Sequence, residues 1–206
     1  MIQKQLLLLL CLISVCLNTM AQDEIAIYKK LFNYSDSITK FGKEGIVSKD
    51  IYKTIKSLDT SYFASFFLKA KELIEEGKFN EAALIFYIGD SRQGYLSLAN
   101  PDYKLSNGDS ALLNSIDPFT YQEINLFLKS NIVNFTKILN LCKEWIVNND
   151  YVYFSKNNNL KTYTELALKL EEMVETFSSK KTIFQLDWSR EQTETRKAVF
   201  AETKNK

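Results

Sequence analysis

Residues 89–95, with the sequence GDSRQGY, bring an acid, a hydroxyl and a guanidinium together at three consecutive positions. The spacing of the serine between its glycines is one residue too long for the G-x-S-x-G nucleophile motif, and the chain contains no His to act as the base. We therefore do not expect Ser91 to be a nucleophile. Asp90 lies one helical turn after Phe86, on the packed side of an expected helix, where a carboxylate needs a donor. The structural interpretation of Asp90 is an ion pair with a Lys or Arg of a neighbouring helix.

Recognition of a partner is the alternative interpretation of the same segment. Exposed Arg and aromatic side chains are the usual anchors of protein interfaces, and Arg92 and Tyr95 lie three residues apart on one expected helix. The segment 101–115 is a plausible rim for such a surface, because loops on rigid helical supports commonly carry recognition. The candidate binding residues are Asp90, Arg92, Gln93 and Tyr95.

Composition argues against several other kinds of chemistry. Without His there is no Ser-His-Asp triad and no imidazole metal site, and the chain has no phosphate-binding glycine motif or calcium loop. We therefore predict no cofactor and no metal ion. The 26 Lys and Arg against 25 Asp and Glu leave a net charge of +1, which gives no electrostatic reason to bind nucleic acid. Cys142 falls on an apolar helical stripe and is expected to be a buried, inert thiol.

The elements that must position these residues are expected to be helices. Six Gly and two Pro in 206 residues favour long helices over many short strands. We expect an all-α fold of about six helices packed as antiparallel hairpins. The clearest hairpin has a first helix whose apolar residues begin at Phe63, a left-handed turn at Gly77, and a second helix from an N-cap at Asn80 to Leu98. Its expected core cluster is Phe66, Ala70, Phe79, Ala82 and Phe86.

The flanking segments carry weaker signals. A short helix is expected over residues 23–32, and Ser48 is the expected cap of another. Asp117-Pro118 starts a helical stretch to residue 148, and its length favours a break near Ser130-Asn131.

The second half of the chain is expected to hold one more strong helix. Residues 151–154 are expected to be extended and 156–159 a turn, and Thr162 with Glu165 forms a capping box. The helical domain spans 22–186, and residues 187–206 form a charged tail or frayed helix.

The first residues, 1–21, are typical of a secretory signal peptide. Lys4 is the only charge, and the run from Leu6 to Leu17 is too short to cross the ~30 Å core of a membrane. We predict cleavage after Ala21, a location outside the cytoplasm (periplasm or secreted), and no stable membrane insertion afterwards. The alternative is a lipid anchor on Cys16.

Residues 70–86 resemble the turn region of a tetratricopeptide-type repeat. Such a repeat has a small residue facing the partner helix, Gly and an aromatic at the turn, and then Ala and an aromatic on the second helix. The matching residues are Ala70, Gly77, Phe79, Ala82 and Phe86. The unit is degenerate and has no second copy along the chain, so the resemblance implies a single helical hairpin rather than a solenoid.

A second resemblance involves residues 86–92, Ile124-Asn125 and Trp145. Together they are similar to exported bacterial helical proteins of uncharacterised function, some of which are encoded beside secreted toxins. This resemblance implies an immunity role. The sequence therefore predicts a non-enzymatic, exported protein-binding module, most specifically an immunity protein that neutralises a toxin. The alternatives are a small envelope hydrolase that uses carboxylates alone, which needs two acids converging in one pocket, and a scaffold component of an envelope assembly.

Overall fold

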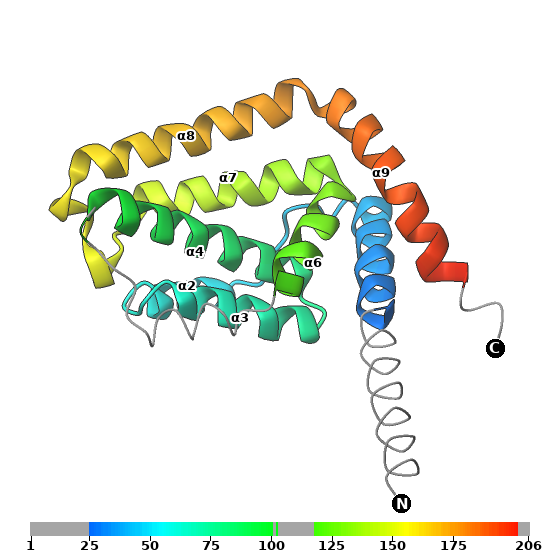
Figure 1. Cartoon of the computed structure of the whole chain (residues 1–206), viewed down its shortest axis with the longest axis horizontal. Helices are drawn as coiled ribbons and strands as arrows, with labels where there is room; N and C mark the ends of the chain where they lie inside the picture. Colours follow the sequence, from blue (N-terminus) through cyan, green and yellow to red (C-terminus); the bar gives the residue numbers. More distant parts are fainter. Residues whose placement is uncertain (1–24, 101, 103–117, 202–206) are drawn as a thin grey trace, which may run out of the picture.

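The computed structural model describes residues 25–100, 102 and 118–201 (Figure 1). The predicted signal peptide, Cys16 and, apart from residue 102, the predicted rim at 101–115 lie outside these residues. The described part holds no strand and contains eight α-helices and two short 3₁₀-helices. The all-α class is therefore confirmed. The predicted number of about six helices is too low. Residues 152–158 form two 3₁₀-helices, and the last part of the described chain forms a helix of its own.

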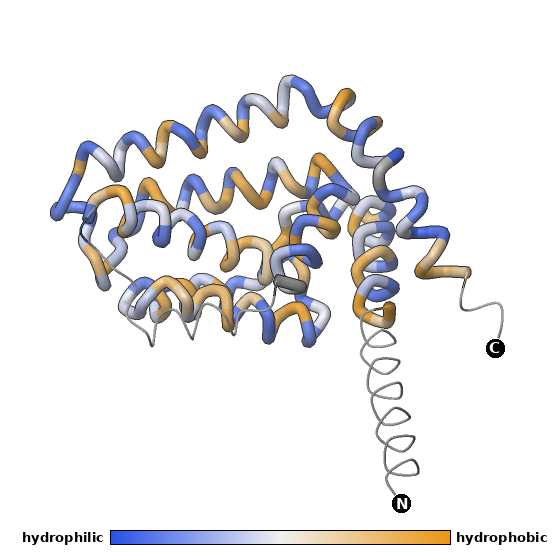
Figure 2. The backbone as a smooth tube through the Cα atoms, viewed as in Figure 1, coloured by the Kyte–Doolittle hydropathy of each residue, from blue (hydrophilic) through white to orange (hydrophobic). Residues whose placement is uncertain are grey.

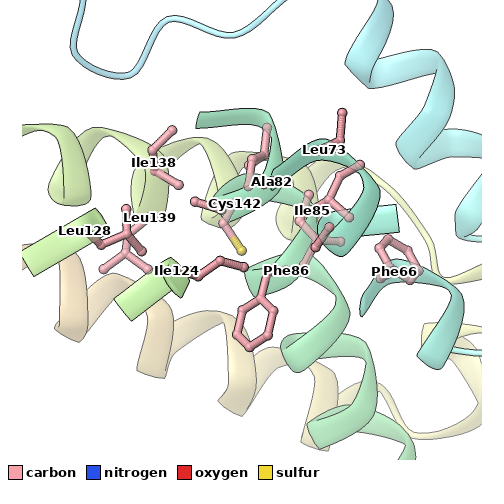
Figure 3. Close-up of a cluster of buried hydrophobic side chains, with 14 of the residues drawn as sticks. Phe66, Leu73, Ala82, Ile85, Phe86, Ile124, Leu128, Ile138, Leu139 and Cys142 are labelled. Carbon is pink, nitrogen blue, oxygen red and sulfur yellow. The ribbon is translucent and has the colours of Figure 1, made fainter. Parts of the chain in front are cut away.

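The hairpin of α3 (Ala64–Glu75) and α4 (Phe79–Ala99) is the centre of the fold. Gly77 has a φ of 75°, in the left-handed region. The N–H groups of Gly77 and Lys78 donate to the carbonyls of Ile74 (2.9 Å) and Leu73 (2.8 Å), the hydrogen bonds expected where a helix ends in a left-handed residue. The five residues predicted for the hairpin cluster are all buried in one core. Side chains from α3, α4, α6 and α7 converge there (Figure 3).

The predicted break at Ser130-Asn131 separates α6 (Pro118–Lys129) from α7 (Ile132–Asn148). The side chain of Asn131 caps α7 by accepting a hydrogen bond from the N–H of Asn134 at 2.9 Å. Cys142 is fully buried on α7, and burial raises the pKa of its thiol to about 12, as expected of an inert cysteine.

Several predicted helix starts differ from the structure. The cap of α4 is Lys78 rather than Asn80, because the Asn80 side chain instead joins a buried amide chain. The Asn80 amide donates to the carbonyl of Ile46 (3.0 Å) and accepts from Asn134 (2.9 Å), whose oxygen binds the N–H of Gly45 (2.8 Å). This chain fixes the segment before α2 (Asp50–Leu58), whose cap is Lys49 rather than Ser48.

The C-terminal half continues as α8 (Leu160–Ser179) and α9 (Lys181–Ala201). Asn159, not Thr162, caps α8, because its side chain accepts the N–H of Thr162 at 3.2 Å. Residues 151–154 are not extended: 3₁₀-helices occupy Val152–Phe154 and Lys156–Asn158. Hydrophobic positions recur along α3, α4 and α7, whereas α8 and α9 are more hydrophilic (Figure 2).

The first and last described helices lie side by side (Figure 1). Within the described residues the first helix covers 25–41, so it continues beyond residue 32, where the sequence predicts its end. Arg196 of α9 donates two hydrogen bonds to Asp36 (2.9 and 3.0 Å) and lies 4.3 Å from the ring centroid of Phe32. The segment 187–206, expected as a charged tail or frayed helix, is α-helical as far as Ala201. None of the described helices is long and apolar enough to cross a membrane.

Candidate functional site

Arg92 is the largest fully buried side chain of the described residues. Helix α4 directs it into the core, where its Nε donates to Asp59 Oδ1 at 2.8 Å and its Nη1 donates to the Tyr163 hydroxyl at 2.7 Å. Its Nη2 donates to the carbonyl of Asn149 at 3.4 Å, and the guanidinium lies 5.2 Å from the ring centroid of Tyr151. A guanidinium buried this completely is stable only with such a set of acceptors.

Asp59, directly after α2, supplies the negative charge of this network. Its second oxygen, Oδ2, accepts the indole N–H of Trp145 at 2.9 Å. Burial raises the pKa of the Asp59 carboxyl, and the charge and hydrogen bond of Arg92 and the hydrogen bond of Trp145 act against that shift. Burial lowers the pKa of Arg92, but Asp59 and Tyr163 outweigh it, so that the pKa of Arg92 is raised. The pair is thus an ion pair with donors on both carboxylate oxygens.

The network holds the connection between α7 and α8 in place. We call residues 149–159 the α7–α8 loop; it is the yellow segment at the left of Figure 1. The Tyr163 hydroxyl accepts from Arg92 and lies 2.7 Å from the carbonyl of Ile146 and 2.8 Å from that of Asn149, at the end of α7. Tyr95, also fully buried on α4, donates to the carbonyl of Ser155 (2.9 Å). The Tyr95 hydroxyl also accepts the N–H of Asn159 (3.2 Å).

Further hydrogen bonds fix the middle of the α7–α8 loop. The N–H of Tyr153 donates to the carbonyl of Asp59 at 2.9 Å, and the Tyr151 hydroxyl donates to the carbonyl of Ser61 at 3.0 Å. Asp150 accepts the hydroxyl of Ser155 and the N–H of Lys156, each at 2.7 Å. Burial raises the pKa of Asp150, but these hydrogen bonds outweigh it, so that the pKa is lowered. The backbone of the loop is therefore bonded to other elements at residues 149, 153, 155 and 159.

The outer face of this fixed loop presents large apolar side chains beside the exposed Asn157 and Asn158. Val152 is 63% exposed and Tyr153 48%, and Leu160, the first residue of α8, is 59% exposed. The ring of Tyr153 packs edge-on against that of the half-buried Tyr62, with 5.9 Å between their centroids. A rigid support that presents large apolar side chains to water is typical of a recognition surface.

The structure separates the four predicted binding residues. Arg92 and Tyr95 are fully buried, so the prediction of an exposed Arg–Tyr pair is wrong. Asp90 is exposed and forms no ion pair with the other described residues, so the prediction of a buried Asp90 pair is also wrong. The helix phase explains both errors: the inward face of α4 carries Arg92, whose partner Asp59 has no local sequence signal. Ser91 is buried, and its hydroxyl donates to the carbonyl of Tyr87.

Asp90 and Gln93 instead line a groove between α4 and α8 with a volume of about 370 Å³. We call it the α4–α8 groove. Its α8 side carries Leu166, Lys169 and Met173. It lies outside the Arg92 network.

Comparison with known proteins adds no function to this site. No family model, no curated protein and no solved structure matches the chain. Among the described residues, no group of three or more Cys, Asp or Glu side chains is placed to hold a metal ion.

Proposed function

We propose that the chain is a protein-binding module that contacts its partner through the α7–α8 loop. The observation that carries the proposal is the combination of exposed Val152 and Tyr153 with a loop backbone bonded to a buried ion-pair network. A loop already fixed in its bound conformation loses little entropy on binding, and Tyr is a common anchor of protein interfaces. In this proposal Arg92 and Tyr95 are positioning residues beneath the surface rather than contacts.

The more specific proposal is an exported immunity protein whose partner is a secreted toxin. It is supported by the sequence resemblance and by the signal-peptide pattern of residues 1–21. A preorganised apolar surface is what a protein inhibitor needs for tight binding.

The geometry favours binding over carboxylate-dependent hydrolysis. Two cavities of the described part are each lined by two acids, as a hydrolase needs. Each of these carboxylates, however, is bonded to a cation or an amide. The four are Asp36, Glu44, Glu144 and Glu171.

A pull-down with matched variants tests the proposal. The wild-type chain, the double variant Val152→Ser/Tyr153→Ser and the control Val147→Ser are immobilised and exposed to an envelope extract of the source cells. Val147 is also an exposed apolar residue, but it lies on α7, outside the loop. We expect a discrete partner that the wild type and the control retain and the loop variant loses, while the thermal midpoints of all three proteins stay the same.

A partner that all three retain equally overturns the assignment of the loop. A secreted toxin as that partner supports the immunity role, whereas a structural envelope protein favours the scaffold alternative.

A further inference from the structure

The α4–α8 groove presents polar side chains that the fold does not use. Asp90, Gln93 and Ser97 follow one another at helical spacing, so they share one face of α4 and line the groove together. None of the three side chains forms a hydrogen bond or ion pair with the other described residues. This contrasts with Arg92 on the same helix, whose donors are matched in the core.

The charge of Asp90 is not neutralised by its neighbours. Lys169, on the α8 side of the groove, is not within ion-pair distance of it, and Arg92 is committed to Asp59. Burial alone raises the pKa of Asp90, although the residue reaches solvent. The ionised carboxylate is therefore partly desolvated and has no counter-charge, and in such surroundings an added cation interacts more strongly than in water.

The opposite side of the groove is apolar apart from Lys169. Leu166, Leu170 and Met173 of α8 line it, and Met173 remains exposed. Gly94 lies between the polar residues of α4, and a Cβ built there would lie 3.5 Å from Leu166 Cδ1, so the absent side chain leaves the groove open toward α8. The groove thus offers acceptors on the α4 side and three apolar side chains on the α8 side, where Lys169 is the one cation of the lining and is not paired with Asp90. Its volume is within the ~300–1,000 Å³ range of ligand pockets.

We propose that the α4–α8 groove binds a cationic side chain of a partner, an arginine, with its guanidinium on Asp90 and its methylene stem against Leu166 and Met173. Arginine fits this arrangement because it carries an apolar stem and a planar fork of five N–H donors. The carboxylate of Asp90 takes the charge, and the side-chain oxygens of Gln93 and Ser97 are within the same groove to accept the remaining donors. This site is separate from the α7–α8 loop and does not depend on the loop's partner.

The test uses n-butylguanidinium, which reproduces the arginine stem and charge, and n-butylurea as its neutral counterpart. Both are titrated into the chain labelled with ¹⁵N and, at its methionine methyl groups, with ¹³C, while the backbone amides of Gly94 and Ser97 and the methyl group of Met173 are followed by NMR. We expect saturable shifts at these three positions with n-butylguanidinium and not with n-butylurea.

Three variants complete the test. Asp90→Asn keeps the side-chain shape and is expected to weaken n-butylguanidinium binding about tenfold or more, the loss of a charge-assisted hydrogen bond. Gly94→Leu fills the groove without changing charge and is expected to abolish the shifts. Asp187→Asn, an exposed acid on α9, is expected to bind as the wild type. Equal binding of the urea, undiminished binding by Asp90→Asn, or no saturable shift with n-butylguanidinium overturns the proposal. None of these outcomes bears on the pull-down through the loop.

Discussion

At the residue scale, the buried guanidinium of Arg92 and the nearly buried carboxylate of Asp59 depend on each other. Arg92→Ala leaves Asp59 in the core without its counter-charge and frees the Tyr163 hydroxyl from its donor. We expect a loss of about 3–5 kcal/mol in the free energy of unfolding, the usual result of breaking a buried pair by removing one partner. Urea unfolding followed by the fluorescence of the two tryptophans, Trp145 and Trp188, measures this loss. An exposed Arg92, as the sequence alone predicts, would lose less than about 1 kcal/mol of unfolding free energy on the same substitution. The experiment therefore distinguishes a buried Arg92 from an exposed one.

Two further variants make the Arg92 experiment specific. Arg190→Ala removes an exposed arginine of α9 and is expected to change stability by no more than about 0.5 kcal/mol. The double variant Arg92→Met/Asp59→Leu removes both charges, and we expect it to be less destabilised than the sum of its two single variants. A small effect of Arg92→Ala, comparable to that of Arg190→Ala, would contradict the buried network.

In contrast to the paired charges of Arg92 and Asp59, the charge of Asp90 is expected to lower the stability of the fold, because it has no counter-charge. Its pKa in the folded chain is raised by burial, so the folded state binds the Asp90 proton more tightly than the unfolded state does. The stability that this proton contributes is complete below the ordinary Asp pKa of about 3.9 and is lost as the pH rises through the raised value.

The substitution that follows from this is Asp90→Asn, which cannot ionise. Near neutral pH it should have a higher thermal midpoint than the wild type, and below the ordinary pKa the difference should disappear. Thermal melts across this pH range measure the difference in midpoint. The control Asp187→Asn is expected to show the same midpoint as the wild type. A lower midpoint of Asp90→Asn at neutral pH would mean that the carboxylate stabilises the fold through a partner. The position would then not be available to a bound cation.

At the element scale, the two glycines of α4 differ in their surroundings. A Cβ built on Gly89 would lie 2.5 Å from the Cβ of Phe66, because α3 packs closely against α4 at this position. At Gly94 the nearest atom is at an ordinary contact distance of 3.5 Å. We expect Gly89→Ala to lower the free energy of unfolding by about 1–3 kcal/mol through overpacking. Gly94→Ala should raise it by about 0.5–1 kcal/mol, because alanine favours the helix. Urea unfolding of the two variants checks the opposite signs, and a shift in the same direction for both would contradict the close approach at Phe66.

The elements that the sequence predicts are those whose signals are local. Helical spacing and the left-handed Gly77 are enough for the α3–α4 hairpin, and the capping amide of Asn131 is enough for the break before α7. The wrong cap of α4 has a clear cause: the polar side chain of Asn80 is diverted to a distant partner. Asn80 bonds to Asn134, 54 residues away, and no pattern near Asn80 contains that information.

The candidate site is harder to predict from the sequence than the helices, because it is built from residues that are far apart in the chain. The segment 89–95 shows that something interrupts the apolar face of α4, but the side on which each residue lies depends on how α4 packs against α7 and α8. Asp59 is 33 residues from Arg92, and Tyr163 is 71. The α7–α8 loop had no sequence signal beyond its aromatic content, since its support comes entirely from other elements.

At the scale of the whole molecule, polar clusters fix the bundle at two separate places. The Arg92 network joins α2, α4, α7 and α8 near the α7–α8 loop, whereas the Asn80–Asn134 chain joins the starts of α4 and α7. Between them lies the continuous hydrophobic core. Buried polar groups that are fully bonded specify one arrangement of helices, because any other arrangement leaves them unpaired.

Helix α9 contributes few buried side chains to this core. Its buried side chains are Gln192 and Val199 among those described, whereas α4, of the same length, has thirteen buried residues. Its other attachments include the Arg196–Asp36 pair, the ring contacts of Trp188 and Phe184, and a hydrogen bond from the N–H of Ile132 to Gln185. Elements with few buried contacts open locally at a lower free energy than the global unfolding.

We therefore expect the amides of α9 to exchange with solvent deuterium faster than those of α4 under native conditions. Hydrogen exchange with mass spectrometry on peptides covering 181–201 and 79–99 measures the two opening free energies. Arg196→Ala should accelerate exchange in α9 and leave α4 unchanged, while the control Lys197→Ala, whose ion pair with Glu194 lies within α9, should have little effect. Equal protection of α9 and α4 would mean that the whole described chain unfolds as one unit. Because the hydrogen bonds that fix the α7–α8 loop come from α4, α8 and the segment after α2, opening of α9 should leave partner capture by that loop intact. Retained capture by Arg196→Ala would then locate recognition at the end of the bundle that the Arg92 network holds.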